Sequence, residues 1–249
     1  MLQKAALITG ASSGIGAALS TRLDQEGFQI LLVGRDSARL RKVSENLKNP
    51  SFCLPTDLED KEATDQLAHA VLTLCQNHHL SLKALIHAAG VFERTSFEST
   101  ALSTWEKDLR VNLLAPVQLT LKLGEKIKQD QSVIVNISST LGLRPVADTS
   151  AYSASKAALN NWTQSLALEW AKDGVRVVGI CPGLVDTPIH PFHGAPEKDP
   201  TRQKAHQAQP LGRMGTPEDI AHTVSFLVSE EASWITGSLW NVDGGISLL

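Results

Sequence analysis

The sequence predicts a single α/β domain in which a parallel sheet of about seven strands is covered by helices on both faces. Short apolar runs rich in β-forming residues alternate with stretches of helical period, a pattern typical of parallel sheets with helical crossovers. With 249 residues and 42% hydrophobic residues, the chain can bury one large core. Because no repeat, low-complexity tract or linker divides it, residues 1–249 are expected to form one domain.

Seven apolar runs are predicted to form the strands. They are AALIT at 5–9, QILLVG at 29–34, SFCLPT at 51–56, ALIHAAG at 84–90, SVIVNIS at 132–138, RVVGIC at 176–181 and SLWNVD at 238–243. Each is short, apolar and followed by a turn or a helical stretch, as expected of a strand buried on both faces.

Six segments between these runs are predicted to be helical. They are expected at about 14–26, 37–48, 59–77, 103–129, 151–172 and 217–229. The last begins at a plausible cap, Thr216, which precedes a proline and two acidic residues. The stretch 184–210 contains several prolines and no strong period, so we expect it to be a mobile flap over the substrate.

Charge and cysteine usage narrow the class of protein. A net charge of −3 and scattered Lys and Arg residues do not form the basic stripe that nucleic-acid binding requires. Cys53, Cys75 and Cys181 lie far apart without metal-ligand spacing, so they are interpreted as core residues in a reducing cytosol. No apolar run approaches the ~20 residues of a membrane span, and the N-terminal run is too short for a signal peptide. We therefore expect a cytoplasmic protein without a metal ion.

The first chemical motif is TGASSGIG at 9–16, directly after the first predicted strand. Gly10 permits a tight turn, while Gly14 and Gly16 remove side chains where a pyrophosphate and a neighbouring strand come close. The helix that follows offers free N–H groups to a phosphate. The spacing G-x-x-x-G-x-G differs from the usual dinucleotide fingerprint. Taken alone, it leaves open that the glycines merely turn the chain.

The tip of the second predicted strand is expected to contact the ribose of a bound dinucleotide. It reads VGRD, and the guanidinium of Arg35 suits a ribose 2'-phosphate, which favours NADP(H). Asp36 leaves two alternatives, a contact with a 2'-hydroxyl that would favour NAD(H), or a helix cap. Asp57, after the third strand, is a candidate partner for an adenine amino group or the cap of the next helix.

The stretch SAYSASKAALNNW at 150–162 contains Tyr152, the only tyrosine of the chain, and Lys156 four residues later. At helical spacing the two side chains lie on one face. A nearby ammonium and an oxidised nicotinamide both favour the phenolate. Lowering the phenol pKa by about three units takes roughly 4 kcal/mol, and such a phenol exchanges protons with an alcohol near neutral pH. Since an isolated pair of this kind is usually an ordinary surface pair, the accompanying motifs decide its meaning.

Five motifs occur in order along the whole chain: TGASSGIG, HAAG at 87–90, NISS at 136–139, YSASK at 152–156 and CPGLVDTP at 181–188. This set resembles the short-chain dehydrogenase/reductase family, and the tail PLGRMGTPEDIA with ITGSLWNVDGG looks most like its 3-oxoacyl-(acyl-carrier-protein) reductases. The resemblance implies a Rossmann-type, doubly wound fold and an oxidoreductase that interconverts a carbonyl and a secondary alcohol. It implies NADP(H) as the cofactor, with NAD(H) as the alternative.

The resemblance also implies roles for four residues. Tyr152 would be the general acid/base, and Lys156 would hold the nicotinamide ribose and lower the pKa of the tyrosine. Ser139, which stands at the family's usual distance before the tyrosine, would hydrogen-bond the substrate oxygen. Asn112 would anchor a water that links Lys156 to solvent.

The remaining candidate residues surround these four. The residues expected to bind the cofactor are Gly10, Ser12, Ser13, Gly14, Ile15, Gly16, Arg35, Asp57, Leu58, Ala89, Gly90, Tyr152, Lys156, Pro182, Gly183, Val185 and Thr187. The apolar candidates for the substrate wall are Leu141, Leu143, Leu184, Ile189 and Phe192. Arg144, His190 and His193 are either ligands for a substrate carboxylate or solvated loop residues.

Two departures from the family pattern bear on the substrate. The family commonly has N-N-A-G where this chain has His87 to Gly90, so the sheet contacts of both asparagines must be replaced. Acyl-carrier reductases tend to present basic residues near the positions of Asp130 and Asp173, where acids would repel the carrier. A free small ketone or alcohol is therefore at least as good an expectation, although Lys126, Lys128 and Lys172 keep an acyl carrier protein open.

The resemblance further implies a homodimer or homotetramer formed through segments 103–129 and 151–172. Their apolar residues either lie at that interface or belong to the core: Leu159, Trp162, Leu166 and Trp170. A non-catalytic dinucleotide-sensing protein on the same fold is the competing function, but it should have lost the tyrosine or the lysine. A methyltransferase would have no use for the pair.

Overall fold

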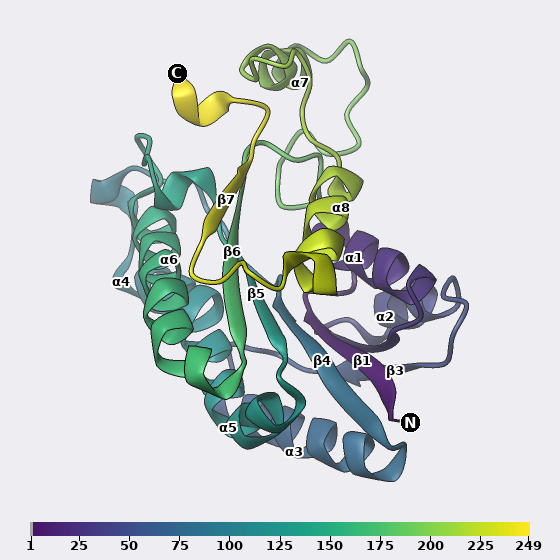
Figure 1. Ribbon diagram of the computed structural model, residues 1–249. Coiled ribbons are helices and arrows are strands. Elements are labelled where there is room, and N and C mark those ends of the chain that lie inside the picture. Colours follow the sequence, from purple (N-terminus) through teal and green to yellow (C-terminus); the bar gives the residue numbers. More distant parts are fainter. Residues whose placement is uncertain (1) are drawn as a thin grey trace.

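A computed structural model, which describes residues 2–249, shows a seven-stranded parallel sheet in the order β3-β2-β1-β4-β5-β6-β7 (Figure 1). The strands are β1 Gln3–Thr9, β2 Gln29–Gly34, β3 Ser51–Pro55, β4 Leu80–His87, β5 Val133–Ile137, β6 Arg176–Pro182 and β7 Leu239–Val242. The direction of winding reverses between β1 and β4. In sheets of this kind ligands bind in the crevice outside the carboxyl ends of the strands at that point.

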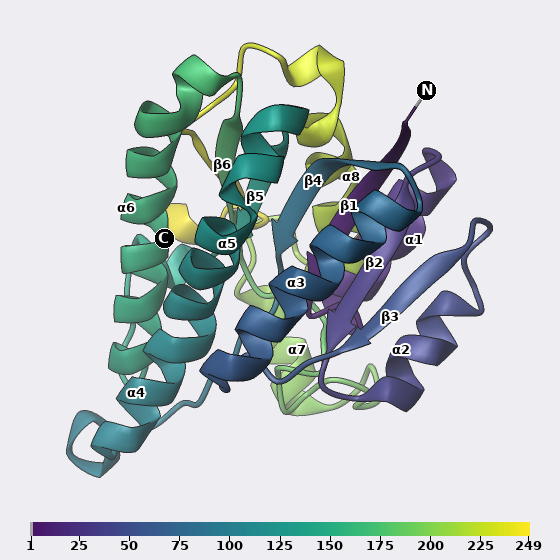
Figure 2. The ribbon, with the colours of Figure 1, turned by 90° about the horizontal axis from the view of Figure 1, so that it is seen from below.

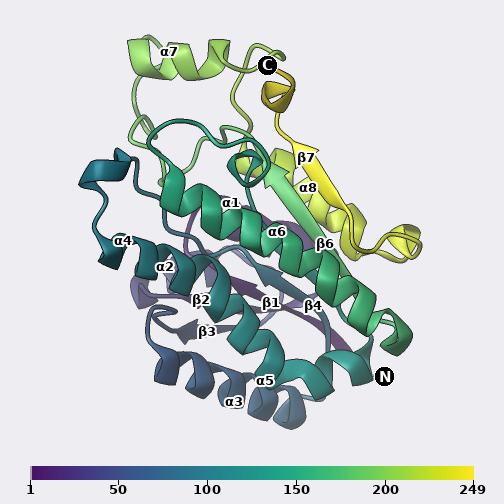
Figure 3. The same cartoon turned by 90° about the vertical axis from the view of Figure 1, so that its left-hand side faces the viewer.

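Helices cover both faces of the sheet, as the sequence predicts. α1 (Gly14–Gln25), α2 (Ser37–Ser44) and α8 (Pro217–Val228) cover one face. α3 (Lys61–Asn77), α5 (Ala115–Asp130) and α6 (Ser150–Trp170) cover the other, which is seen from below in Figure 2 and from the side in Figure 3. The doubly wound, Rossmann-like architecture is thereby confirmed.

The core consists of two apolar clusters, one on each face of the sheet. Alternate residues of each central strand enter opposite clusters: Ala6 and Ile8 pack toward α1 and α8, whereas Ala5 and Leu7 pack toward α3 and α5. All four are fully buried. A strand buried on both faces needs apolar residues at successive positions, which is why these runs could be recognised in the sequence.

The predicted helix 103–129 is two helices joined by a wider turn. α4 (Leu102–Leu109) leads into a π-helical turn, Arg110–Leu114, before α5 begins. Pro116 lies in the first turn of α5, where a missing backbone N–H is tolerated. The hydrophobic spacing continues through the junction, so the sequence pattern could not separate the two helices. Single π turns often mark functional sites.

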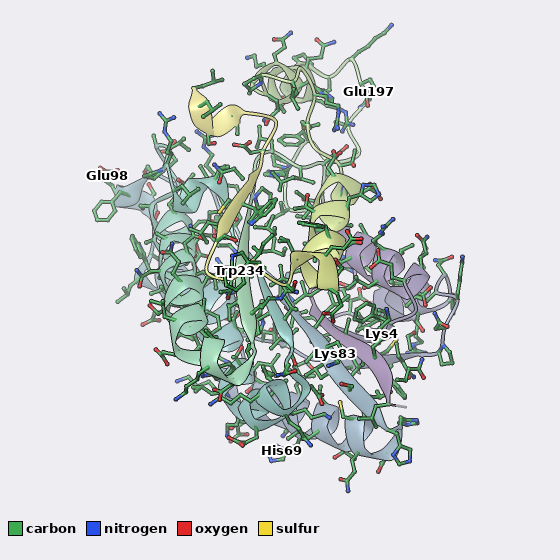
Figure 4. The ribbon with its side chains drawn as sticks, in the orientation of Figure 1. Lys4, His69, Lys83, Glu98, Glu197 and Trp234 are labelled. Carbon is green, nitrogen blue, oxygen red and sulfur yellow. The ribbon has the colours of Figure 1, made fainter. Side chains whose placement is uncertain are left out.

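The segment 184–210 contains a helix that the sequence analysis did not predict. α7 (Pro200–Gln207) begins after Asp199, whose side chain accepts hydrogen bonds from the Thr201 and Arg202 amides at 2.8 and 3.1 Å. Asp followed by Pro is a recognisable helix start, but the surrounding prolines obscured it. In Figure 4, Glu197 of this segment lies near the top of the view, well above Lys4 and Lys83.

The structure bears on two predictions from composition, the state of the cysteines and the lack of a membrane span. All three cysteines are free, with Cys75 and Cys181 buried and Cys53 half-buried. No helix within residues 2–249 combines the length and the apolar character needed to cross a bilayer.

Candidate active site

The glycine-rich turn between β1 and α1 fits closely against its neighbours. Gly10 has a φ of +70°, and a Cβ there would lie 2.8 Å from the Ala88 carbonyl oxygen. A Cβ on Gly16 would collide with the backbone of Gly10. Gly14 has a φ of +51°, and a Cβ would lie 3.1 Å from the Thr187 side chain. These are positions that only glycine fills without strain, and together they hold the turn closely against the end of β4 and the segment after β6.

The start of α1 keeps its hydrogen-bond donors free. Ser13 is the N-cap residue, and its side chain makes no capping hydrogen bond. The first N–H groups of a helix have no intrahelical partners, and they attract anions. Ser12 faces the tip of β2, where a Cβ on Gly34 would lie 3.2 Å from its Oγ. The residues of this turn therefore fit the pyrophosphate of a dinucleotide. Ile15 packs against the core.

The two charged residues at the tip of β2, Arg35 and Asp36, have different surroundings. The Asp36 carboxylate accepts hydrogen bonds from the Ala38 and Arg39 amides at 2.9 and 3.0 Å and pairs with the Arg39 guanidinium at 3.0 Å. These contacts, led by the Arg39 amide, lower the pKa of Asp36. It is thus the cap of α2. Arg35 is exposed, and nothing in the described chain forms an ion pair with it.

Asp57 and Leu58 follow β3. The helix cap considered for Asp57 is wrong, because Asp60 caps α3 by accepting from the Glu62 and Ala63 amides. Asp57 accepts instead from the Glu59 amide at 3.1 Å and is exposed. The Leu58 side chain is buried in the core on the α3 face, so only its backbone can face a cofactor.

The HAAG segment at the end of β4 contacts both β1 and α5. The Thr9 hydroxyl accepts hydrogen bonds from the Ala88 and Ala89 amides, both at 3.1 Å. His87 Nε2 lies 3.0 Å from the Thr120 hydroxyl of α5. Burial and the neighbouring Lys156 lower the pKa of His87 to about 3, so the imidazole is neutral. The segment that departs from the family pattern is thus held by hydrogen bonds to β1 and α5.

Ser139, Tyr152 and Lys156 are brought together at the carboxyl end of the sheet. α6 begins at Ser150 and carries the tyrosine and the lysine on one face, and both are more than nine-tenths buried. Lys156 Nζ donates to the Ile137 carbonyl at 2.9 Å and lies 5.8 Å from the centre of the Tyr152 ring. The Ser139 side chain lies near enough to the Tyr152 phenol to lower its pKa. Ser138 instead donates to the Lys156 carbonyl at 3.3 Å.

Asn112 lies in the π turn beside these three residues. Its Nδ2 donates to the Val91 carbonyl at 3.1 Å and to the Ser155 hydroxyl at 3.0 Å, and its Oδ1 accepts from the Val91 amide at 2.9 Å. A Cβ on Gly90 would lie 3.4 Å from Asn112 Oδ1 and 3.7 Å from Lys156 Nζ. The Asn112 side chain and the Lys156 ammonium thus both lie beside Gly90, just after the end of β4.

Burial dominates the pKa values of Tyr152 and Lys156 in the protein without coenzyme. Burial raises the pKa of Tyr152 to about 12; the nearby Ser139 side chain lowers it, and Asp108 and Cys181 raise it. Burial lowers the pKa of Lys156 to about 8. The low phenol pKa expected from Lys156 and an oxidised nicotinamide together stays a prediction for the protein with bound coenzyme. The desolvation of Tyr152 affects its pKa more than the Lys156 ammonium does. That ammonium donates its hydrogen bond to the Ile137 carbonyl.

The segment after β6 lies against the glycine turn. The Thr140 hydroxyl donates to the Pro182 carbonyl at 3.2 Å, and a Cβ on Gly183 would lie 2.8 Å from the Asp243 carbonyl oxygen. Thr187 is buried next to Gly14. The Val185 side chain belongs to the core, so its backbone alone is available to a ligand.

Aromatic rings form a wall beside Tyr152. Phe92 meets the tyrosine ring edge to face with centroids 4.8 Å apart. His190 lies 6.3 Å from Phe92 and stacks on Phe192 at 4.8 Å. Phe92 was not predicted, although an aromatic residue just beyond the HAAG strand end was the available signal. Leu141 lies beside Ser139, because its amide donates to Ser139 Oγ at 3.1 Å.

Other predicted substrate residues are placed less favourably. Leu184 lines a separate hollow of about 180 Å³ beside β7 and α8. Leu143 and Ile189 are exposed. Two of the candidate carboxylate ligands are already engaged: Arg144 donates to the Ser247 carbonyl at 2.5 Å, and His193 lies 2.8 Å from the Asp186 carboxylate.

A larger hollow, about 750 Å³, lies at the other end of the sheet. Its lining includes Lys4, Lys83, Arg176 and Trp234, which belong to the beginnings of strands or to the turn before β7. Because ligands of parallel α/β sheets bind at the carboxyl ends of the strands, this hollow is not the candidate site.

A dinucleotide-binding sheet with a Ser, Tyr and Lys cluster at its switch point defines a class of oxidoreductase. The chain matches a family model described as enoyl-(acyl carrier protein) reductase over residues 10–247. It belongs to the short-chain dehydrogenase/reductase family.

Relatives of known name agree with this assignment. The chain is 33% identical to the 3-oxoacyl-(acyl-carrier-protein) reductase FabG of Aquifex aeolicus, over 98% of this chain and 97% of the relative. Among solved structures, a putative NAD(P)-dependent gluconate 5-dehydrogenase from Beutenbergia cavernae with bound NADP has a TM-score of 0.90 and 30% identity, covering 100% and 98% of the two chains. A 3-ketoacyl-(acyl-carrier-protein) reductase from Brucella melitensis complexed with NADH has a TM-score of 0.89 and 29% identity, covering 98% of each chain.

Proposed function

We propose that this protein is an NADP(H)-dependent oxidoreductase that interconverts a carbonyl and a secondary alcohol, with Tyr152 as the general acid/base. The observation that carries the proposal is the buried cluster of Ser139, Tyr152 and Lys156 at the same end of the sheet as the closely packed glycine turn. A buried phenol, an ammonium and a hydroxyl in one place serve proton transfer to a reacting oxygen.

Each residue of the cluster has a distinct role in this proposal. The bound nicotinamide supplies or accepts the hydride. Tyr152 gives a proton to the substrate oxygen during reduction and takes it back during oxidation. Ser139 orients that oxygen, and Lys156 holds the nicotinamide ribose. Asn112, fixed by Val91 and Ser155, keeps the path from Lys156 toward solvent in place.

The preference for NADP(H) rests on the tip of β2. The Asp36 carboxylate is occupied by the first turn of α2 and by Arg39, so it is poorly placed to accept a ribose 2'-hydroxyl. Arg35 is exposed beside it and suits a 2'-phosphate by its charge and forked donors. An NAD-dependent alcohol dehydrogenase of the same family is the alternative.

For the substrate we propose a small ketone or alcohol, bound against Phe92, His190 and Phe192 under the flap 184–210. A substrate linked to an acyl carrier protein is the alternative. The argument against it from Asp130 fails, because that carboxylate is buried, accepts from the Leu82 amide at 2.6 Å and pairs with Lys126 at 2.9 Å. Asp173 pairs with Lys128 at 3.2 Å.

We also propose a homodimer or homotetramer in the cytosol. Leu159 and Leu166 belong to the core, so they cannot form the subunit contact. On the same helical layer Leu121 and Leu168 are 69% and 84% exposed, and apolar residues so exposed favour a protein partner. The mass of the particle in light scattering distinguishes a monomer from these assemblies.

The substitution Tyr152→Phe tests the function. We expect it to keep NADPH binding, measured by the enhanced fluorescence of the bound nicotinamide, and to lower turnover by roughly 100-fold or more, because the general acid/base is lost. Substrates are found by screening ketones, 3-oxoacyl thioesters and sugars with NADPH.

Thr149→Ala, a change elsewhere at the start of α6, is the control. Turnover of Tyr152→Phe close to that of the wild type would remove the acid/base assignment. NADPH binding without turnover by the wild type on any substrate would favour the non-catalytic, dinucleotide-sensing alternative.

A further inference from the structure

The helix α7, in the flap 184–210, has few packing partners. In Figure 1 it stands apart from the helices that cover the sheet. Within residues 2–249 it makes no extensive contact with another helix or strand. Its Arg202 side chain is nevertheless only 11% exposed. A guanidinium buried to this extent needs an acidic partner, because an unpaired buried charge is costly.

The Arg202 guanidinium bridges two acidic residues of the flap. Its Nη1 lies 2.7 Å from the Asp186 carboxylate, and its Nε and Nη2 donate to the Glu197 carboxylate at 3.1 and 2.9 Å. Glu197 is 75% exposed, so its pair adds little stability. Asp186 directly follows a residue of the core, in the segment after β6. The pair with Asp186 therefore ties α7 to the body of the protein, together with a hydrogen bond from the Met214 amide to His206 Nδ1 at 3.1 Å.

Asp186 also holds the first half of the flap. One oxygen of its carboxylate contacts Arg202, and the other lies 2.8 Å from His193 Nδ1. Its backbone amide donates to the Gly215 carbonyl at 2.9 Å, which fixes the position of Asp186 itself. A single carboxylate thus connects both halves of the flap to one fixed point.

The segment between Asp186 and His193 faces the candidate active site. Thr187 is buried beside the glycine turn. The His190 and Phe192 rings belong to the aromatic wall. Because the side chains at the two ends of this segment contact each other, its course depends on the same carboxylate that anchors α7.

We propose that Asp186 and Arg202 are positioning residues that hold the flap over the nicotinamide half of the bound coenzyme. The inference rests on the proposed function, in which the nicotinamide lies beside Tyr152 to exchange a hydride with the substrate. The aromatic wall stands beside the same tyrosine, so the segment that carries it covers this half. The adenosine half is assigned to the tip of β2 and is independent of the pair.

The substitution Arg202→Met tests the proposal, because it removes the charge and keeps most of the length of the side chain. We expect NADPH and NADH to bind about 3-fold to 10-fold more weakly in nicotinamide fluorescence, as for loss of a partly buried ion pair. Binding of 2'-phospho-ADP-ribose, which lacks the nicotinamide, should stay unchanged in calorimetry. Lys204→Met is the matched control, since it removes an exposed cation from the same helix, and it should leave all three affinities unchanged.

A double-mutant cycle tests the pair itself. Asp186→Asn and Arg202→Met break the same contact, so their effects on NADPH binding should be far from additive. Arg202→Lys keeps the charge and should restore part of the lost affinity. In hydrogen exchange of the protein without coenzyme, Arg202→Met should speed exchange in residues 187–193 as well as in α7, because both depend on Asp186.

Equal losses of NADPH and 2'-phospho-ADP-ribose binding in Arg202→Met would overturn the proposal, because they would reflect a general defect or a contact with the 2'-phosphate. So would unchanged NADPH binding, additive effects in the cycle, or faster exchange confined to α7. The proposed function is tested independently, because Tyr152→Phe leaves the pair intact. Loss of turnover in Tyr152→Phe would still support the general acid/base if Arg202→Met left NADPH binding unchanged.

Discussion

At the residue scale, burial acts on Tyr152 and Lys156 in opposite directions. It raises the pKa of the phenol to about 12 and lowers that of the ammonium to about 8. Both changes favour the neutral form of the group. The free protein therefore holds a protonated tyrosine, the form that donates a proton to a carbonyl oxygen. Oxidation of an alcohol needs the phenolate, and a bound nicotinamide cation favours it.

A substitution at Arg35 tests the preference between NADPH and NADH. The substitution Arg35→Ser should weaken NADPH binding by about 10-fold to 100-fold, because a charge-assisted contact with the 2'-phosphate is lost. NADH binding should change little. Arg41→Ser is the control, since Arg41 is an exposed arginine on the neighbouring helix α2. Equal losses for NADPH and NADH, measured by nicotinamide fluorescence, would assign Arg35 another role.

At the element scale, helix starts were more predictable than helix junctions. The cap at Thr216 was predicted because the residues after it suit a first turn, and the structure shows a full capping box with Asp219. The split between α4 and α5 could not be predicted, because a π turn adds no change of composition.

The capping box carries a prediction on stability and pH. The Arg213 side chain, aided by the Thr216 amide, holds the pKa of Asp219 near 2. Because this value lies below that of the unfolded chain, the stabilisation is present above about pH 4 and is lost as the pH falls toward 2. Asp219→Ala should therefore lower the free energy of unfolding at neutral pH by about 1 kcal/mol.

Urea unfolding of Asp219→Ala and the wild type measures this difference. Glu218→Ala, an exposed change in the same first turn, is the control and should cost less. A difference between Asp219→Ala and the wild type that stays constant from neutral pH to pH 2 would contradict the assignment.

At the scale of the whole molecule, the sheet order decides which sequence motifs meet. β1, β4 and β5 are neighbours, so the glycine turn, the HAAG segment and Ser139 all lie at one edge. The motifs themselves were visible in the sequence, and the parallel fold follows from the alternation of apolar runs and helices. Their distances were not visible, and neither was the aromatic contact of Phe92 with Tyr152, which depends on the course of the chain after β4.

The same scale explains why the tyrosine pKa of the protein without coenzyme could not be predicted from the sequence. Spacing places Lys156 beside Tyr152, but it does not show how deeply both are buried or that Lys156 donates to Ile137. Desolvation is a property of the assembled core and flap. Because of this desolvation, the pKa of the Tyr152 phenol depends on what binds at the glycine turn.

The most direct measurement is the titration of the single tyrosine, followed by NMR of labelled Tyr152, with and without saturating NADP⁺. The account predicts a pKa well above the ordinary value in the free protein and a clear fall when the positively charged nicotinamide binds. A tyrosine pKa that is the same in both states, with NADP⁺ bound, would contradict the role of Tyr152 as the acid/base of this site.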